Sequence, residues 1–282
     1  MQKIAIITDS CSDLTFKTLE QYKLTMFPIR IIYKEREFLD KIEITSEEMY
    51  ANLAKEVPST SLPDLDYCET KVAELKAEGF TDFIVITVSS NLSGTLNALR
   101  ILAEHHTDIH FHFFDSLTLG YPQGVIAIEA GKMAMSGENV ETILTKLEDV
   151  RKRTHGYIAL DTLEYLKRGG RLGKVTATLG ELISLKPIIS SNDEGVLFTH
   201  CKARGKKQAL SKVKQLILSY LEKGKCSVWV LQGDALQEGT ALFEELKEHP
   251  NLNYLSLETV GPSMGVHTGP GVVGFAILEE SK

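Results

Sequence analysis

The segment Val88-Ser89-Ser90-Asn91-Leu92-Ser93-Gly94-Thr95 decides the fold prediction, because it joins a strand pattern to a helix pattern. Residues 82–87 before it are rich in the β-branched and aromatic side chains of buried parallel strands. After it, apolar side chains recur at helical spacing as far as Leu102. Ligands of α/β proteins collect at such turns, where helix N-termini offer unpaired N–H groups to an anion. The segment alone fits a plain helix cap at Ser93 as well as an anion site.

Composition limits the protein class. The 282 residues are 43% hydrophobic and 24% charged, which is typical of one large or two modest globular domains. The net charge of −7 argues against general nucleic-acid binding, which needs a basic face. The four cysteines lie far apart, which favours free thiols in a reducing compartment over disulfides or zinc. With no signal peptide and no apolar run of about 18 residues, the sequence predicts a soluble cytoplasmic protein.

The first half of the chain alternates strand and helix patterns. Strands are expected at residues 4–7, 26–33, 82–87 and 109–114, and helices at 16–22, 43–55, 67–78, 95–102, 125–135 and 140–150. Residues 58–64 hold three hydroxyls between two prolines and are expected to be irregular. This alternation favours a parallel sheet with helices on both sides. We therefore predict an N-terminal α/β domain over residues 1–155.

The pattern changes in the second half. Short strands are expected at residues 157–160, 188–190 and 196–198, with a hairpin-like turn at Asn192-Asp193-Glu194-Gly195. A long helix at 206–223, a strand at 227–232, a helix at 240–249 and strands at 253–257 and 272–278 follow. Residues 261–271 are so rich in Gly and Pro that we expect no regular element there. The result is a mixed or antiparallel α/β domain over residues 156–282.

Four polar turns are candidates for a binding site: residues 8–13, 60–64, 89–95 and 261–271. Turns that follow parallel strands converge on one edge of a sheet, so their hydroxyls and N–H groups make a socket for a carboxylate or phosphate. His267 lies among Gly and Pro, where a ligand can approach closely, although a lone histidine is more often structural. Arg171 fits a helix C-cap cation as well as an anion ligand. Arg204 belongs to a basic run that is either a solvated face or a docking patch.

Several familiar chemistries are excluded by missing motifs. Ser93 lacks the flanking glycines of a nucleophile elbow. The sequence holds no phosphate loop of the G-x-x-x-x-G-K-[ST] type and no G-x-G-x-x-G after the first strand. It also lacks H-E-x-x-H, and the spacing of His105, His106, His110 and His112 does not favour a metal. We therefore expect no metal and no cofactor.

Taken together, seven short motifs resemble the DegV family of bacterial fatty-acid-binding proteins. The resemblance covers essentially the whole chain, and the order and spacing of the motifs make it specific. The motifs are Thr8-Asp9-Ser10 with Asp13-Leu14, Thr60-Ser61-x-Pro63, Leu92-Ser93-Gly94-Thr95, Asp115-Ser116, Leu166-x-x-Gly169-Gly170-Arg171, Lys186-Pro187-Ile188, and Gly265-x-His267-x-Gly269-Pro270-Gly271.

The resemblance implies two α/β domains that hold a long-chain fatty acid between them. It implies that the carboxylate is bound by Ser93 and by Thr60 or Ser61, and that His267 and Arg171 complete the site. Gly94, Thr95 and Thr268 are expected to belong to the same ligand-binding set. One departure is visible: the family usually reads Thr-Ser-Gln-Pro-Ser where this chain has Thr60-Ser61-Leu62-Pro63-Asp64.

The resemblance also implies a protein partner. Some family members present the acid to a separate ATP-dependent kinase, which makes an acyl phosphate for phospholipid synthesis, and Arg204 matches an arginine implicated in that coupling. The leading hypothesis is therefore a non-catalytic acyl-binding subunit that contacts membrane surfaces transiently. The alternatives are an independent hydrolase or phosphotransferase with Ser93 as nucleophile and His267 as base, and a binder of another small carboxylate or phosphate.

Overall fold

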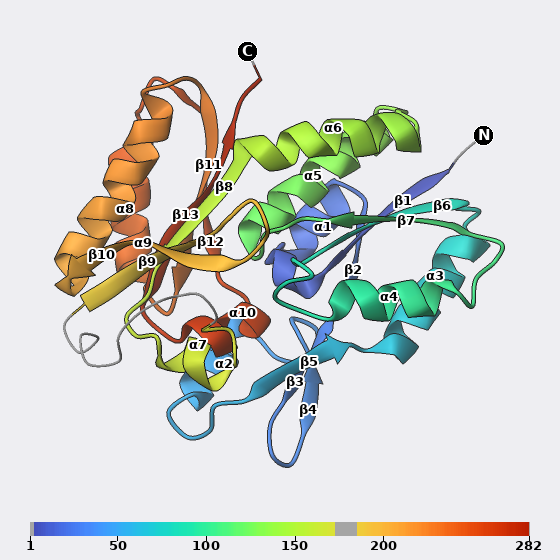
Figure 1. Cartoon of the computed structure of the whole chain (residues 1–282), viewed down its shortest axis with the longest axis horizontal. Coiled ribbons are helices and arrows are strands. Elements are labelled where there is room, and N and C mark those ends of the chain that lie inside the picture. The colour runs from blue at the N-terminus through green and yellow to red at the C-terminus, as the bar shows by residue number, and fades with distance from the viewer. Residues whose placement is uncertain (1–2, 173–184, 282) are drawn as a thin grey trace.

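A parallel sheet opens the fold of the chain, of which the computed structural model describes residues 3–172 and 185–281 (Figure 1). Its four strands run in the order β2-β1-β6-β7, and every neighbouring pair is parallel. The predicted alternation of strands and helices is therefore confirmed for this half. The strands and the helices that follow or cover them are β1 (Ile4–Asp9), β2 (Leu24–Phe27), β6 (Asp82–Thr87), β7 (His110–Asp115), α1 (Phe16–Gln21), α3 (Leu65–Ala77), α4 (Thr95–Ala103), α5 (Tyr121–Met135) and α6 (Val140–Arg153).

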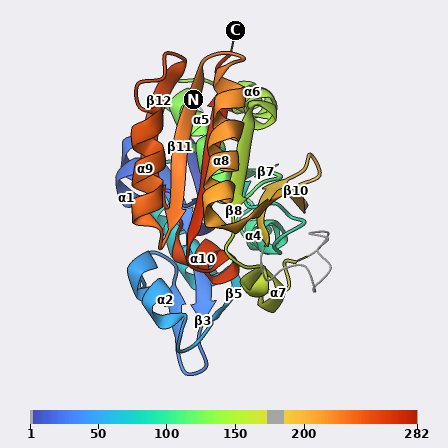
Figure 2. The same cartoon turned by 90° about the vertical axis from the view of Figure 1, so that its left-hand side faces the viewer.

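A second sheet of six strands has the order β10-β9-β8-β13-β11-β12 and is antiparallel except for the parallel pair β11–β12. The predicted mixed sheet is confirmed. Helices α8 and α9 cover its outer face, as the rotated view shows (Figure 2). Its elements are β8 (Thr154–Ala159), β9 (Leu185–Ser191), β10 (Leu197–Arg204), β11 (Cys226–Gly233), β12 (Leu252–Thr259), β13 (Val272–Glu279), α8 (Gly205–Leu221) and α9 (Leu236–Leu246).

Helices α5 and α6 pack between the two sheets. One apolar core joins Ile84 and Ile86 of the parallel sheet to Val125 and Ile143 of these helices and to Trp229 of the six-stranded sheet. Helix α5 is thus buried on two sides, which explains why its sequence is apolar almost throughout. Each large side chain buried here contributes about 1.5–3 kcal/mol to stability. The division of the chain at residue 155 stays a prediction, and β8 of the second sheet begins at Thr154.

A third, small antiparallel sheet corrects two predictions. Its strands are β3 (Ile29–Ile32), β4 (Glu37–Leu39) and β5 (Ser59–Pro63), in the order β4-β3-β5. Residues 26–33 do not form one strand, because Pro28, which has no N–H to donate, separates β2 from β3. Residues 58–64 are not irregular, because an edge strand such as β5 tolerates proline.

The segment at residues 261–271 also differs from the prediction, since it contains α10 (Pro262–Thr268). Pro262 suits the first turn of a helix, where its missing N–H leaves nothing unpaired. Gly265 is required by packing: a Cβ there would lie 2.2 Å from the Met49 Cε. Met49 belongs to α2 (Ser46–Asn52), which is shorter than the predicted helix at 43–55 and begins with a capping box between Thr45 and Glu48. No described helix is long and apolar enough to cross a membrane.

Candidate functional site

Ser93 lies in the loop between β6 and α4, at the carboxyl end of the parallel sheet. Its Oγ is 2.8 Å from the Thr95 Oγ1 and accepts the Thr95 backbone N–H at 3.3 Å. The residue that caps α4 is Gly94, one position later than the cap we expected, and it makes no side-chain cap bond. The Ser93 hydroxyl is therefore held at the N-terminus of α4 without serving as the helix cap.

A cavity of about 280 Å³ opens beside this loop, where the three sheets meet. Its polar walls hold seven of the eight residues predicted to bind ligand: Thr60, Ser61, Ser93, Gly94, Arg171, His267 and Thr268. The eighth, Thr95, is fully buried behind Ser93. The remaining walls are mostly apolar and come from β3, β8, β9, β10, α7 (Glu164–Arg168) and the loops after β6 and β7. Folding thus brings the predicted residues to one cavity.

His267, in the last turn of α10, joins two of the predicted turns. Its Nε2 is 2.8 Å from the Thr60 Oγ1 of β5, while its Nδ1 is buried and has no hydrogen-bond partner among the described residues. Burial, with a smaller effect from the nearby Arg171 guanidinium, lowers the pKa of His267 to about 4. The imidazole is neutral at pH 7 and offers one N–H donor. The unpaired Nδ1 lies against Gly169 and is closed off from solvent.

Arg171 lies just after α7. Its Nη1 donates to the Gly169 carbonyl at 2.6 Å and its Nε to the Leu92 carbonyl at 3.4 Å. Arg171 therefore fits both interpretations, because it binds carbonyls at the end of a helix, as a C-cap cation does, and it also lines the cavity, where an anion could bind. Gly169 is required beside it, because a Cβ there would lie 2.1 Å from the His267 Nδ1.

Three buried aspartates accept hydrogen bonds from the backbone of the segments that form the site. Asp9 accepts the Val88 N–H at 2.8 Å, at the start of the Ser93 loop. Asp13 accepts the Gly261 N–H at 2.9 Å, and Asp40 accepts the Ser263 N–H at 3.3 Å, both at the N-terminus of α10. The turn at 8–13 was predicted as part of a binding site, but not as a set of hydrogen-bond acceptors for the neighbouring loops. Asp40 lies in an ordinary stretch that gave no signal.

Burial dominates the electrostatics of these aspartates. Desolvation raises the pKa of Asp9 to about 6, although backbone N–H groups oppose the shift. It raises the pKa of Asp13 to about 7, against the opposing charge of Lys41. The pKa of Asp40 is also raised by burial. These groups hold protons far more readily than exposed aspartates.

A narrow extension of about 40 Å³ adjoins the cavity on the side of the apolar core. The two spaces share six lining residues: Leu119, Ile158, Ile189, Leu197, Met264 and Thr268. Beyond them, the extension is lined mainly by aromatic and aliphatic side chains such as Tyr121, Val260 and Phe275. We call this extension the inner chamber. One end of the combined space is polar and the other mainly apolar, which is the shape that an amphipathic ligand requires.

Other predicted features lie outside the cavity. Arg204 is exposed at the start of α8, and its backbone N–H donates to Gln208. Asp64 is the acid at the position where the family motif usually has serine. It caps α3 by accepting the Tyr67 N–H at 2.8 Å, so its carboxylate is engaged there. The described parts of the chain contain no cluster of metal-binding side chains.

Comparisons with known proteins agree on one family. A family model described as an uncharacterised protein of the DegV family matches residues 3–280. A DegV domain-containing protein of Clostridium perfringens is 46% identical over 280 residues, covering 99% of this chain and 100% of that protein.

Solved structures give the same answer. The crystal structure of DegV, a fatty acid binding protein from Bacillus subtilis, matches with a TM-score of 0.91 and 27% identity, covering 99% of this chain and 100% of that one. A stearic acid-binding protein from Eubacterium ventriosum matches with a TM-score of 0.87 and 26% identity, covering 99% of this chain and 98% of that one.

Proposed function

This chain belongs to the DegV family, and we propose from that premise that it binds a long-chain fatty acid, with the carboxylate among Ser93, Thr60 and His267. The observation that carries the proposal is the cavity itself, polar at one end and apolar at the other. Relatives of the same fold are described as fatty acid binding proteins, one of them as stearic acid-binding.

The polar end supplies several neutral donors and one positive charge. The hydroxyls of Thr60, Ser61 and Ser93 donate to carboxylate oxygens, and neutral His267 donates one N–H. Gly94, Thr95 and the first turn of α4 contribute backbone N–H groups and the positive end of the helix dipole. Arg171 adds the charge that balances the anion, and Thr268 lines the entrance to the inner chamber.

The acyl tail supplies most of the affinity. Each methylene taken out of water contributes about 0.8 kcal/mol, so a chain of many methylenes outweighs the head group. The tail runs past Ile158, Ile189 and Leu197 toward the inner chamber. This orientation leaves the carboxylate at the seam between the sheets, where a second protein can reach it.

For the finer function, we propose an acyl-binding subunit of a fatty acid kinase in the bacterial cytoplasm. A separate ATP-dependent protein would phosphorylate the bound carboxylate, and exposed Arg204 would contact that partner. The sequence has no phosphate loop of its own, which favours a partner that brings ATP. An independent Ser–His enzyme is less well supported. The described structure holds no hydrogen bond between Ser93 and His267, and each side chain bonds a threonine instead.

Lipid extraction and a binding assay test the proposal. We expect mass spectrometry of the denatured protein to find a long-chain acid at about one per chain. After delipidation, Ser93→Ala and His267→Ala should each lower the affinity for oleic acid about 5- to 150-fold, the cost of an unpaired buried oxygen. The control is Ser90→Ala, because Ser90 is exposed in the same loop. The absence of both an extracted lipid and saturable uptake would overturn the proposal.

A further inference from the structure

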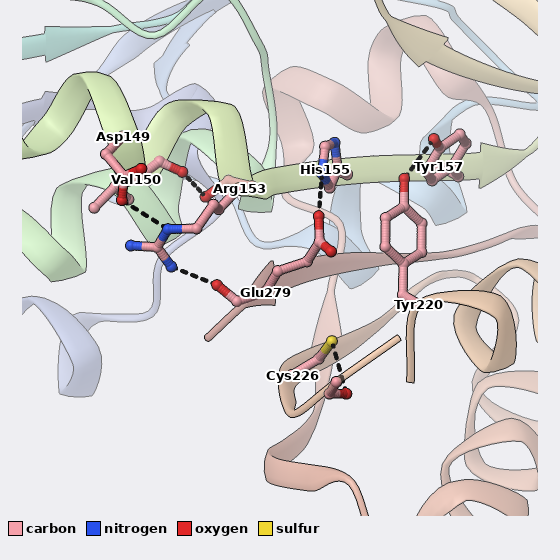
Figure 3. Close-up of polar contacts among 10 residues, drawn as sticks. Asp149, Val150, Arg153, His155, Tyr157, Tyr220, Cys226 and Glu279 are labelled. Carbon is pink, nitrogen blue, oxygen red and sulfur yellow. Dashed lines mark hydrogen bonds and ion pairs between the residues drawn. The ribbon is translucent and has the colours of Figure 1, made fainter. Parts of the chain in front are cut away.

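An open cleft of about 740 Å³ lies on the far side of the inner chamber from the carboxylate site. It is bounded by the ends of β7 and α6, by β8, by the turn after β9 and by α8. Figure 3 shows part of its wall, where His155 and Tyr157 project from β8. The Tyr157 hydroxyl meets the Tyr220 hydroxyl of α8 at 2.9 Å, and the His155 ring stacks on the Tyr220 ring with centroids 5.0 Å apart.

The cleft and the inner chamber share one wall. Five residues line both spaces: Thr118, Gly156, Tyr157, Ser190 and Ser191. The inner chamber in turn shares six residues with the carboxylate cavity. The inner chamber therefore adjoins both the carboxylate cavity and the outer cleft, and the five shared residues form its wall toward the cleft.

Hydroxyl groups close the shared wall. The Ser191 Oγ donates to the Thr118 Oγ1 at 3.1 Å, and the Ser190 Oγ donates to the Gly156 carbonyl at 2.7 Å. Thr118 accepts a hydrogen bond in this arrangement, and its own hydroxyl proton has no acceptor among the described contacts. The methyl end of a plain fatty acid gains nothing from such groups. A terminal oxygen gains a hydrogen bond that it otherwise loses on leaving water.

We propose that this wall recognises an oxygen at the distal end of the acyl chain, so that the ligand class includes long-chain ω-hydroxy acids. The inference rests on the proposed fatty-acid function, because it requires the carboxylate to be bound at the opposite end. Thr118 accepts a hydrogen bond from the terminal hydroxyl of the ligand or donates one to it, and the hydroxyl of Ser191 rotates to match. Beyond the wall, the open cleft is lined by the charged residues Arg151, Lys152 and Asp193. A polar group at the end of the ligand therefore lies next to a hydrated surface.

Binding of matched acid pairs tests the inference. Delipidated full-length protein is titrated with ω-hydroxy acids of increasing chain length, each beside its unsubstituted parent, and the fluorescence of the single tryptophan reports binding. Trp229 is well placed as a probe, since its ring lies 5.9 Å from that of Tyr121 in the chamber wall. We expect one chain length at which the hydroxy acid binds at least as tightly as its parent.

A loss of affinity on adding the terminal hydroxyl would contradict the inference. If the hydroxyl weakens binding by about tenfold or more at every length, the chamber end is a closed apolar space and the inference is wrong. If no acid of either kind binds saturably, the proposed function itself fails. The two failures are therefore distinguishable.

Variants of Thr118 place the effect at the wall. Thr118→Val keeps the shape and removes the hydroxyl, so the preference for the hydroxy acid over its parent should fall at least about fivefold. Thr118→Ser keeps the hydroxyl and should retain the preference. Thr70→Val makes the same change at an exposed position of α3, which lines neither the inner chamber nor the cleft, and serves as the control. An unchanged preference in folded Thr118→Val would overturn the assignment.

Discussion

Replacing Asp13 by asparagine removes a pH-dependent cost from the folded protein. Asp13 is fully buried, and its Oδ1 accepts the Gly261 N–H at the start of α10. Burial raises its pKa from 3.8 to about 7. Asparagine is nearly isosteric, cannot ionise and keeps an oxygen that accepts the same N–H.

The sign of the effect follows from proton binding. Between pH 3.8 and about 7, folded Asp13 keeps a proton that the unfolded chain has released. The free energy of unfolding therefore falls as pH rises through this range. The stabilisation is fully present below pH 3.8 and is lost as pH rises through 7, a total of about 4 kcal/mol. Between pH 5 and pH 8 the change is about 2.5 kcal/mol.

Urea denaturation of the delipidated protein measures this change, with Trp229 as the reporter. The free energy of unfolding of Asp13→Asn minus that of the native chain should rise by about 2.5 kcal/mol from pH 5 to pH 8. Asp9 and His267 titrate in both proteins, so their contributions largely cancel. Asp66→Asn, an exposed acid of α3, is the control and should show no such trend. A flat or falling difference would mean that Asp13 is held ionised by Lys41, and would refute the reasoning.

Two further substitutions test the site and the partner. Gly169→Ala places a Cβ 2.1 Å from the His267 Nδ1, so the ring must move, and fatty-acid affinity should fall about tenfold in a titration. Gly224→Ala, where a Cβ meets open space, should leave affinity unchanged; equal losses would remove His267 from the site. Arg204→Glu should lower acyl-phosphate formation with a kinase partner and leave fatty-acid affinity within about twofold, since it adds charge repulsion only at the docking surface. A parallel loss of lipid binding would contradict the docking role.

Local patterns predicted most of the fold. The apolar strand patterns predicted the parallel sheet, and the helix predicted at 43–55 is present as the shorter α2. The errors fall where long-range packing decides the backbone. Residues 59–63 form a strand by pairing with β3, and α10 packs against α2 where Gly265 leaves room for Met49 and Tyr50. Neither partner is visible from the local sequence.

The sequence by itself determined the residue types at the site, because the motifs that carry hydroxyls, glycines and His267 lie in recognisable turns. Only the tertiary structure decided how they meet. Thr60 and His267 are 207 residues apart and lie within hydrogen-bond distance. The pKa values of Asp9 and Asp13 and the wall between the chamber and the cleft likewise depend on what packs around them. Desolvation and cavity shape are sums over many distant neighbours, and no local stretch of sequence contains them.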